Sequence, residues 1–123
     1  MMKSLLIVGI GSFFGGVMRY AISMLMKNFC AQSFPWATLI VNLLGCFFLG
    51  TAVTLFGKYN LTNSLWCLML TTGFCGGFTT FSAFANESLQ LLQNGNFGLF
   101  ILYLFASISL GLLFIALGYT IVK

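Results

Sequence analysis

Gly73-Phe-Cys-Gly-Gly-Phe-Thr-Thr-Phe-Ser-Ala-Phe84 lies in the middle of a long apolar region and decides the fold. Three glycines precede two threonines and a serine, which is a poor composition for a continuous lipid-facing helix. Lipid offers no hydrogen-bond partner, so irregular backbone at membrane depth must be buried in protein or line a wet cavity. The segment therefore predicts a broken membrane helix whose backbone dipoles are available to an ion.

The amino-acid composition predicts that this chain is embedded in lipid. Of 123 residues, 60% are hydrophobic and only 5% are charged, whereas about a quarter of the residues of soluble domains are charged. A membrane helix needs about 20 apolar residues, and four such spans fit, at about 5–26, 37–56, 65–92 and 97–122. We predict one all-α transmembrane domain over residues 1–123, with the third helix broken near its middle. Because no small-residue cleavage site follows the first apolar run, we expect a retained helix there rather than a signal peptide.

The few charged residues exclude several classes of function. Five Lys and Arg residues stand against a single acid, Glu87, and the chain has no His. The cations form no patch, so we predict no nucleic-acid binding. Without His or Asp, most routes to acid–base catalysis and most metal-ligand sets are absent, and we expect no enzyme. The four cysteines form no C-x-x-C pair and are interpreted as small buried hydrophobes.

The positive charges predict membrane orientation only weakly. Four helices place both termini on one side, together with Lys3, Lys58 and Lys123, while Lys27 and Arg19 fall nearer the other side. Orientation follows the Lys and Arg excess of the cytoplasmic loops, and three against two decides little. Two interpretations stay open, a single fixed topology or insertion both ways round, which would permit an antiparallel homodimer. Four helices hardly enclose a pore, so a two-fold dimer is the smallest expected assembly.

Small and polar residues recur at helical spacing inside the apolar spans. Gly11-x-x-x-Gly15 and Gly73-x-x-x-Gly77 have the spacing of close helix contacts in membranes. Asn42 lies in the middle of the second span, on a face shared with Thr38, Gly45 and Cys46 at helical spacing. The Asn42 amide either bonds another helix or donates a hydrogen bond to a passing anion.

Hydroxyls and aromatic rings offer further contacts to an anion. Tyr103, Ser107 and Gly111 share one stripe of the fourth span at i, i+4 and i+8. These hydroxyls either join helices or form a track of hydrogen-bond donors. Phe81 and Phe84 follow the break and stand on one helix face. Their rings either fill the core and contact lipid or turn positive edges toward an anion.

Two ionisable side chains fall in or near the apolar spans. Arg19, the sole arginine, lies well inside the first span. It either extends to the nearby interface or lines a vestibule where it steers ions. Glu87 lies one turn beyond the second of the two phenylalanines, where it could pair with a cation, cap the inner mouth of a pathway or exchange a proton.

Three motifs in order resemble the Fluc-type (CrcB-type) fluoride channels of microbes. They are Gly16-Val-Met-Arg-Tyr20, Thr38-Leu-Ile-Val-Asn-Leu-Leu-Gly45, and the glycine-bearing segment extended by one residue to Thr72. The resemblance covers essentially the whole chain. It implies a fluoride-selective passive ion channel in the bacterial inner membrane that exports cytoplasmic fluoride and gives fluoride resistance. It also implies a dual-topology antiparallel homodimer with two separate pores.

The resemblance implies roles for particular residues. The positions that would line the fluoride pathway carry donors or aromatic rings: Asn42, Thr80, Phe81, Ser82, Phe84, Tyr103 and Ser107. The backbone carbonyls of Gly76 and Thr79 would hold a structural Na⁺ between the subunits, and no organic cofactor is implied. Gly111 stands where many members have a further hydroxyl, which bears on the length of the polar track.

The alternative function is a small four-helix multidrug or cation antiporter. Such exporters have a similar length and can also insert both ways, but they need an intramembrane carboxylate in the first helix to exchange protons and cations. The first span, at about 5–26, has Arg19 and no acid, which favours the channel. A packing subunit of a larger membrane complex would explain the apolar composition but not the ordered hydroxyls after the glycines.

Overall fold

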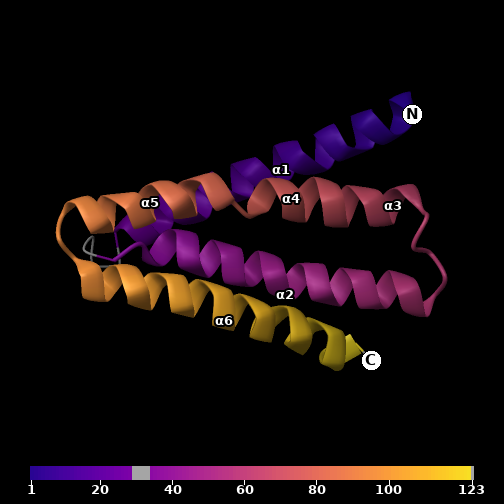
Figure 1. Cartoon of the computed structure of the whole chain (residues 1–123). Coiled ribbons are helices and arrows are strands. Elements are labelled where there is room, and N and C mark those ends of the chain that lie inside the picture. Colours follow the sequence, from indigo (N-terminus) through magenta and orange to yellow (C-terminus); the bar gives the residue numbers. More distant parts are fainter. Residues whose placement is uncertain (29–33, 123) are drawn as a thin grey trace.

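The computed structural model describes residues 1–28 and 34–122, and every regular element within these ranges is a helix (Figure 1). The elements are α1 (Met2–Lys27), α2 (Trp36–Lys58), α3 (Leu65–Leu68), the π-helix η1 (Met69–Cys75), α4 (Gly76–Phe78), α5 (Phe81–Gln93) and α6 (Phe97–Val122). Because α3 to α5 form one segment, four helical segments are long and apolar enough to cross a membrane. The predicted all-helical chain with four long apolar helices is confirmed.

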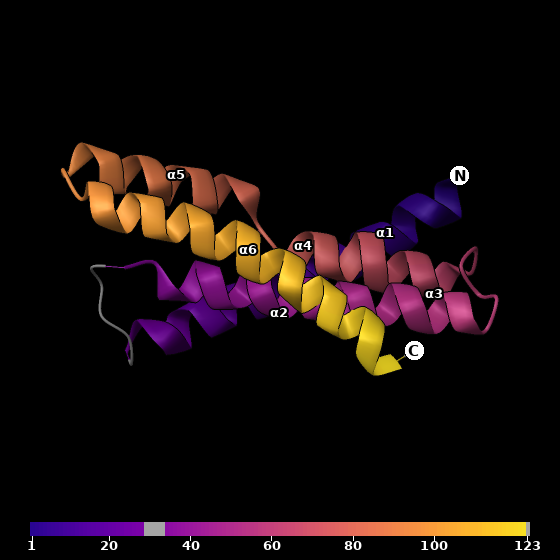
Figure 2. The same ribbon diagram turned by 60° about the horizontal axis from the view of Figure 1, so that its bottom comes forward.

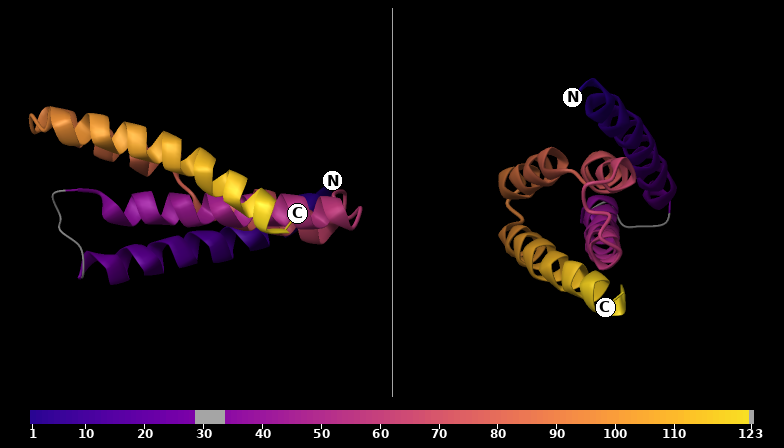
Figure 3. Two further views of the ribbon diagram at one scale, coloured as in Figure 1. Left: turned by 90° about the horizontal axis from the view of Figure 1, so that it is seen from below. Right: turned by 90° about the vertical axis from the view of Figure 1, so that its right-hand side faces the viewer.

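The four segments run antiparallel in sequence order, so both ends of the chain lie at the same end of the bundle (Figure 1). The end-on view in Figure 3 shows α2 between α6 on one side and α3 to α4 on the other, while α5 lies beside α6. Helix α2 packs along α6, while α1 packs against η1 and α4. Thus the part of the third segment before the break, α3 to α4, packs against α1, while the part after the break, α5, packs against α6.

Glycine stripes let α1 approach the broken segment closely. Gly11 and Gly15 are buried in α1, and a Cβ added to Gly11 would lie 2.9 Å from the backbone nitrogen of Phe74. In the other direction, a Cβ on Gly77 would lie 2.6 Å from the carbonyl oxygen of Ser12. The close packing predicted from the small-xxx-small spacing is therefore confirmed, and the two stripes pack against each other.

We expect Gly15→Ala to destabilise the fold and Gly16→Ala not to destabilise it, since alanine favours a helix interior over glycine. A Cβ on Gly15 would lie 2.8 Å from the backbone nitrogen of Phe78, whereas a Cβ on Gly16 meets nothing within 4 Å. Overpacking of this kind costs about 1–3 kcal/mol. Thermal unfolding in detergent measures the difference between two neighbouring substitutions on one helix. Equal melting temperatures for both variants would contradict the close contact.

The third segment changes direction at Thr79 and Thr80. Both residues have extended backbone, with ψ of 158° and 121°, and Figure 2 shows α5 offset from the line of α4. The Thr79 hydroxyl donates to the Cys75 carbonyl at 2.9 Å, and the Thr80 hydroxyl caps α5 by accepting from the Ala83 amide at 3.2 Å. The predicted interruption of the third helix is confirmed, while the π-helix that precedes it follows from no pattern in the sequence.

Candidate functional site

An open groove beside the break gathers most of the predicted site residues. Its volume is about 710 Å³, and its walls come from α2, η1, α4, α5 and α6. The predicted residues that line it are Asn42, Gly76, Thr79, Thr80, Phe81, Phe84 and Ser107. Ser82, Tyr103 and Arg19 lie outside its lining. Among residues 1–28 and 34–122, no charged side chain contributes to this lining, so an ion in the groove meets dipoles and rings of these residues.

Asn42 forms hydrogen bonds to the extended backbone of the break through both the nitrogen and the oxygen of its side-chain amide. Its Nδ2 donates to the Thr80 carbonyl at 3.1 Å, and its Oδ1 accepts from the Thr80 N–H at 2.8 Å. An intersegment bond is thus what the structure shows for this side chain. A primary amide carries two N–H groups, and Asn42 lines the groove, so one N–H is left to donate to a further acceptor.

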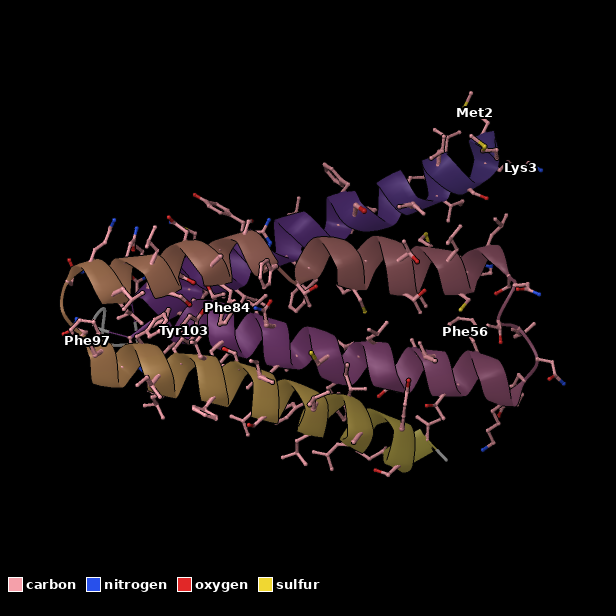
Figure 4. All side chains as sticks on the ribbon, viewed as in Figure 1. Met2, Lys3, Phe56, Phe84, Phe97 and Tyr103 are labelled. Atoms are coloured by element: carbon pink, nitrogen blue, oxygen red, sulfur yellow. The ribbon has the colours of Figure 1, made fainter. Side chains whose placement is uncertain are left out.

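Three aromatic rings follow one another from the groove into the protein. The ring centroids of Phe81 and Phe84 are 5.8 Å apart, and those of Phe84 and Tyr103 are 5.0 Å apart. Tyr103 is fully buried, whereas Phe81 is 78% exposed. Figure 4 shows Phe84 and Tyr103 close together between α5 and α6. Tilted rings at these spacings bring edges as well as faces toward neighbouring groups.

Glu87 is the acceptor for two hydroxyls from two other helices. The Thr38 hydroxyl donates to its Oε2 at 3.0 Å, and the Tyr103 hydroxyl donates to its Oε1 at 3.1 Å. Sequence patterns assign Thr38 no role beyond a shared face with Asn42. The face that carries Phe84 also carries Glu87 one turn later, and this spacing is the one pattern that could have placed the carboxylate beside Tyr103.

We expect Tyr103→Phe to destabilise the protein, because it removes one of the two hydroxyls that satisfy Glu87. Glu87 is partly buried, and the net contribution of an intramolecular hydrogen bond is about 0.5–1.5 kcal/mol. Thermal unfolding of the purified protein measures the loss, with Tyr119→Phe as the control. Tyr119 lies on the same helix and is 45% exposed. An equal effect of the two substitutions would show that the Glu87 contact contributes nothing to stability.

The remaining hydroxyls of the predicted site differ in whether they already have a hydrogen-bond partner. Thr80 and Ser82 lie 3.3 Å apart through their side-chain oxygens at the start of α5. Ser107 is partly buried and lines the groove, and its hydroxyl oxygen has no hydrogen-bond partner in the described part of the chain. Gly111 is buried one turn further along α6. Of the predicted track, Ser107 therefore has a buried hydroxyl without a partner in the described part of the chain.

Arg19 reaches from α1 to the end of α4. Its Nε donates to the Gly77 carbonyl at 3.4 Å, and the side chain is half-buried. A cation is favourable at the C-terminal end of a helix, where carbonyl groups lack intrahelical partners. Of the two interpretations left open by the sequence, neither anticipates this contact with the break.

Comparison with known proteins decides the family. The family model described as CrcB-like protein, Camphor Resistance (CrcB), matches residues 6–119. The chain belongs to the CrcB family. The resemblance stated from the three sequence motifs is thereby confirmed.

Several curated relatives of this CrcB-family chain are similar along their full length. A protein of Phocaeicola vulgatus is 45% identical over 117 residues, which is 95% of this chain and 96% of the relative. One of Azobacteroides pseudotrichonymphae is 42% identical over 123 residues, covering 100% and 98% of the two chains. One of Bacillus cereus is 47% identical over 113 residues, covering 92% of each chain. The first two are named fluoride-specific ion channel FluC and the third FluC 2. These names denote bacterial ion channels, not enzymes.

Proposed function

We propose that this CrcB-family protein is a fluoride-selective passive channel that exports cytoplasmic fluoride across the bacterial inner membrane. The observation that carries the proposal is the uncharged groove at the helix break, which combines amide and hydroxyl donors with aromatic rings. A conducting path must replace the hydration shell of its ion and still let the ion leave. Full-length relatives named fluoride-specific ion channels support the choice of ion.

The residues that take over the solvation of fluoride are the donors along the groove and behind it. The free Asn42 N–H and the Ser107 hydroxyl provide neutral donors, and the rings of Phe81 and Phe84 provide positive edges. The Thr80 and Ser82 hydroxyls stand at the start of α5, and Tyr103 continues the row of rings into the protein. No charged group of the described residues lines the groove, so fluoride is neither repelled nor held too tightly by them.

The driving force for export is the membrane potential. A negative interior is worth about 2.3 kcal/mol per elementary charge per 100 mV, which moves an anion outward through a passive pore. An alternating-access antiporter would instead need an acid in α1, and that helix contains none within Met2–Lys27. The channel mechanism thus requires only a solvated path and no energy source other than the electrochemical gradient.

The pathway is completed by a second copy of the chain in an antiparallel, dual-topology homodimer. Two features support this assembly. The groove is open to the surface, and Phe81 at its edge is 78% exposed although it stands among the proposed fluoride contacts. A second subunit packed on the groove would cover this ring and close one wall of each of two pores. The near balance of Lys and Arg between the two sides permits both orientations.

A structural Na⁺ fits the carbonyls of Gly76 and Thr79. Unwound backbone carbonyls in discontinuous membrane helices are typical ligands of Na⁺. Gly76 is exposed in the groove and Thr79 has extended backbone, and no side chain or turn amide in the described ranges donates to either carbonyl. Two carbonyls from each subunit would supply four oxygen ligands at the centre of the dimer, and this cation would hold the two breaks together.

A bacterium that lacks its own fluoride exporter tests the proposed function in cells. Expression of this chain should restore growth on fluoride and lower the internal fluoride concentration, with chloride stress as the control. Failure of the chain, expressed in the membrane as a dimer, to lower internal fluoride would contradict the proposal. Extrusion of a cationic dye with no effect on fluoride would favour the antiporter.

A further inference from the structure

The backbone hydrogen bonds at the break do not continue the helical ladder. In an α-helix each N–H donates to the carbonyl four residues earlier. The Thr79 N–H still does so, donating to the Cys75 carbonyl at 3.0 Å. The Thr80 N–H donates instead to Asn42 Oδ1 at 2.8 Å. In a continuous helix the Thr80 N–H would donate to the Gly76 carbonyl. Because this N–H donates to Asn42 instead, the Gly76 carbonyl lacks its helical partner.

Side chains from α1 and α2 occupy other carbonyls of the break. Arg19 Nε donates to the Gly77 carbonyl at 3.4 Å, and Asn42 Nδ2 donates to the Thr80 carbonyl at 3.1 Å. These bonds hold the break from two sides and reach two carbonyls that alternate with those of Gly76 and Thr79. The carbonyls of Gly76, Phe78 and Thr79 receive none of these side-chain donors, and those of Gly76 and Thr79 are the two assigned above to the cation.

We propose that Asn42 is the positioning residue of the cation site, because its Oδ1 takes the Thr80 N–H and so frees the Gly76 carbonyl to bind Na⁺. Arg19 fixes the neighbouring Gly77 carbonyl. The inference rests on the cation site proposed above and gives Asn42 a second task besides any contact with fluoride. Asn42, Gly76 and Thr79 all line one groove, so a single side chain serves the anion and the cation.

The two ends of the amide can be separated by substitution. Asn42→Asp keeps an oxygen that accepts from the Thr80 N–H and loses the donor. Asn42→Leu introduces a side chain of nearly the same size that lacks both the accepting oxygen and the donating nitrogen. The Thr80 N–H can then donate to the Gly76 carbonyl. Residues that orient metal ligands without binding the metal typically contribute about 10–100-fold to affinity. We therefore expect a weaker cation site in the Leu variant and a preserved site in the Asp variant.

The measurement is the apparent Kd for Na⁺, obtained from the rise in melting temperature of the purified dimer with Na⁺ concentration. A ligand that binds only the folded state stabilises it by RT ln(1 + [Na⁺]/Kd), and N-methylglucamine at equal ionic strength is the control. The apparent Kd should rise about tenfold or more in the Leu variant and stay near the wild-type value in the Asp variant. A merely structural role would lower the melting temperature without changing the apparent Kd.

Several results would overturn the inference. Equal Na⁺ dependence in wild type and the Leu variant would show that Asn42 does not govern the Gly76 carbonyl. Equal loss in the Asp and Leu variants would show that the accepting oxygen is not the part that matters. If the Leu variant gives no stable dimer, Asn42→Ala makes the same comparison with less strain. A wild-type protein that ignores Na⁺ would remove the cation site and the inference together, while fluoride efflux, measured separately, would still decide the channel function.

Discussion

Phe84→Ile is expected to lower fluoride efflux from reconstituted vesicles by about tenfold or more while the dimer still assembles. The Phe84 ring stands 5.8 Å from Phe81 and 5.0 Å from Tyr103, centroid to centroid, so it joins the groove to the buried tyrosine. Isoleucine keeps the side chain apolar and removes the ring quadrupole with its positive edge. A loss of about 1.4 kcal/mol of stabilisation at the barrier is enough for a tenfold lower rate.

Phe81→Ile should have the same effect, because Phe81 stands at the groove edge as the first ring of the row. Phe105→Ile is the matched control, since Phe105 is 69% exposed on α6 and lies outside the groove lining. Efflux is measured with a fluoride-selective electrode after a potassium ionophore sets the membrane potential. Wild-type rates in both the Phe81 and the Phe84 variants would remove the proposal that ring edges solvate fluoride.

The second large effect is expected for Asn42→Asp, which should lower fluoride conduction several-hundredfold. The substitution places a negative charge where a donor is needed and removes the bond to the Thr80 carbonyl. Two like charges 4 Å apart repel by about 4 kcal/mol at an effective dielectric constant of about 20, which would slow passage several-hundredfold. Chromatography in detergent shows whether the variant still assembles as the wild type does.

The control for this substitution is Asn96→Asp, which introduces the same charge in the turn between α5 and α6. Its efflux should match the wild type. Unchanged transport in Asn42→Asp would show that Asn42 serves only the packing of the break. Loss of fluoride transport with preserved Na⁺ dependence would separate its contact with the anion from its effect on the Gly76 carbonyl.

The sequence predicts features that depend on neighbouring residues. Four apolar runs of membrane length indicate four helical segments, and the glycines followed by Thr79 and Thr80 indicate the interruption. A backbone that lacks partners in lipid must be arranged around such a composition, so the position of the break follows from local chemistry. The stripe of Gly11 and Gly15 predicts close packing for the same reason, since small residues allow helices to approach.

The partners of the site residues follow from tertiary packing and could not be predicted in the same way. Asn42 forms hydrogen bonds to Thr80, 38 residues away in sequence, and Glu87 accepts hydrogen bonds from hydroxyls of two other helices. Which glycine stripe packs against which also depends on how the segments are placed. The π-helix Met69–Cys75 has no sequence signature here. Spacing places a residue on a face of its own helix, but it does not say which residue of another helix that face will meet.

Efflux from vesicles that contain the purified protein, with fluoride and chloride compared under the same membrane potential, tests the central claim most directly. The groove offers small neutral donors and ring edges without a fixed charge, so the account predicts rapid dissipation of a fluoride gradient and none of a chloride gradient. Equal dissipation of both anions, or of neither, would contradict it.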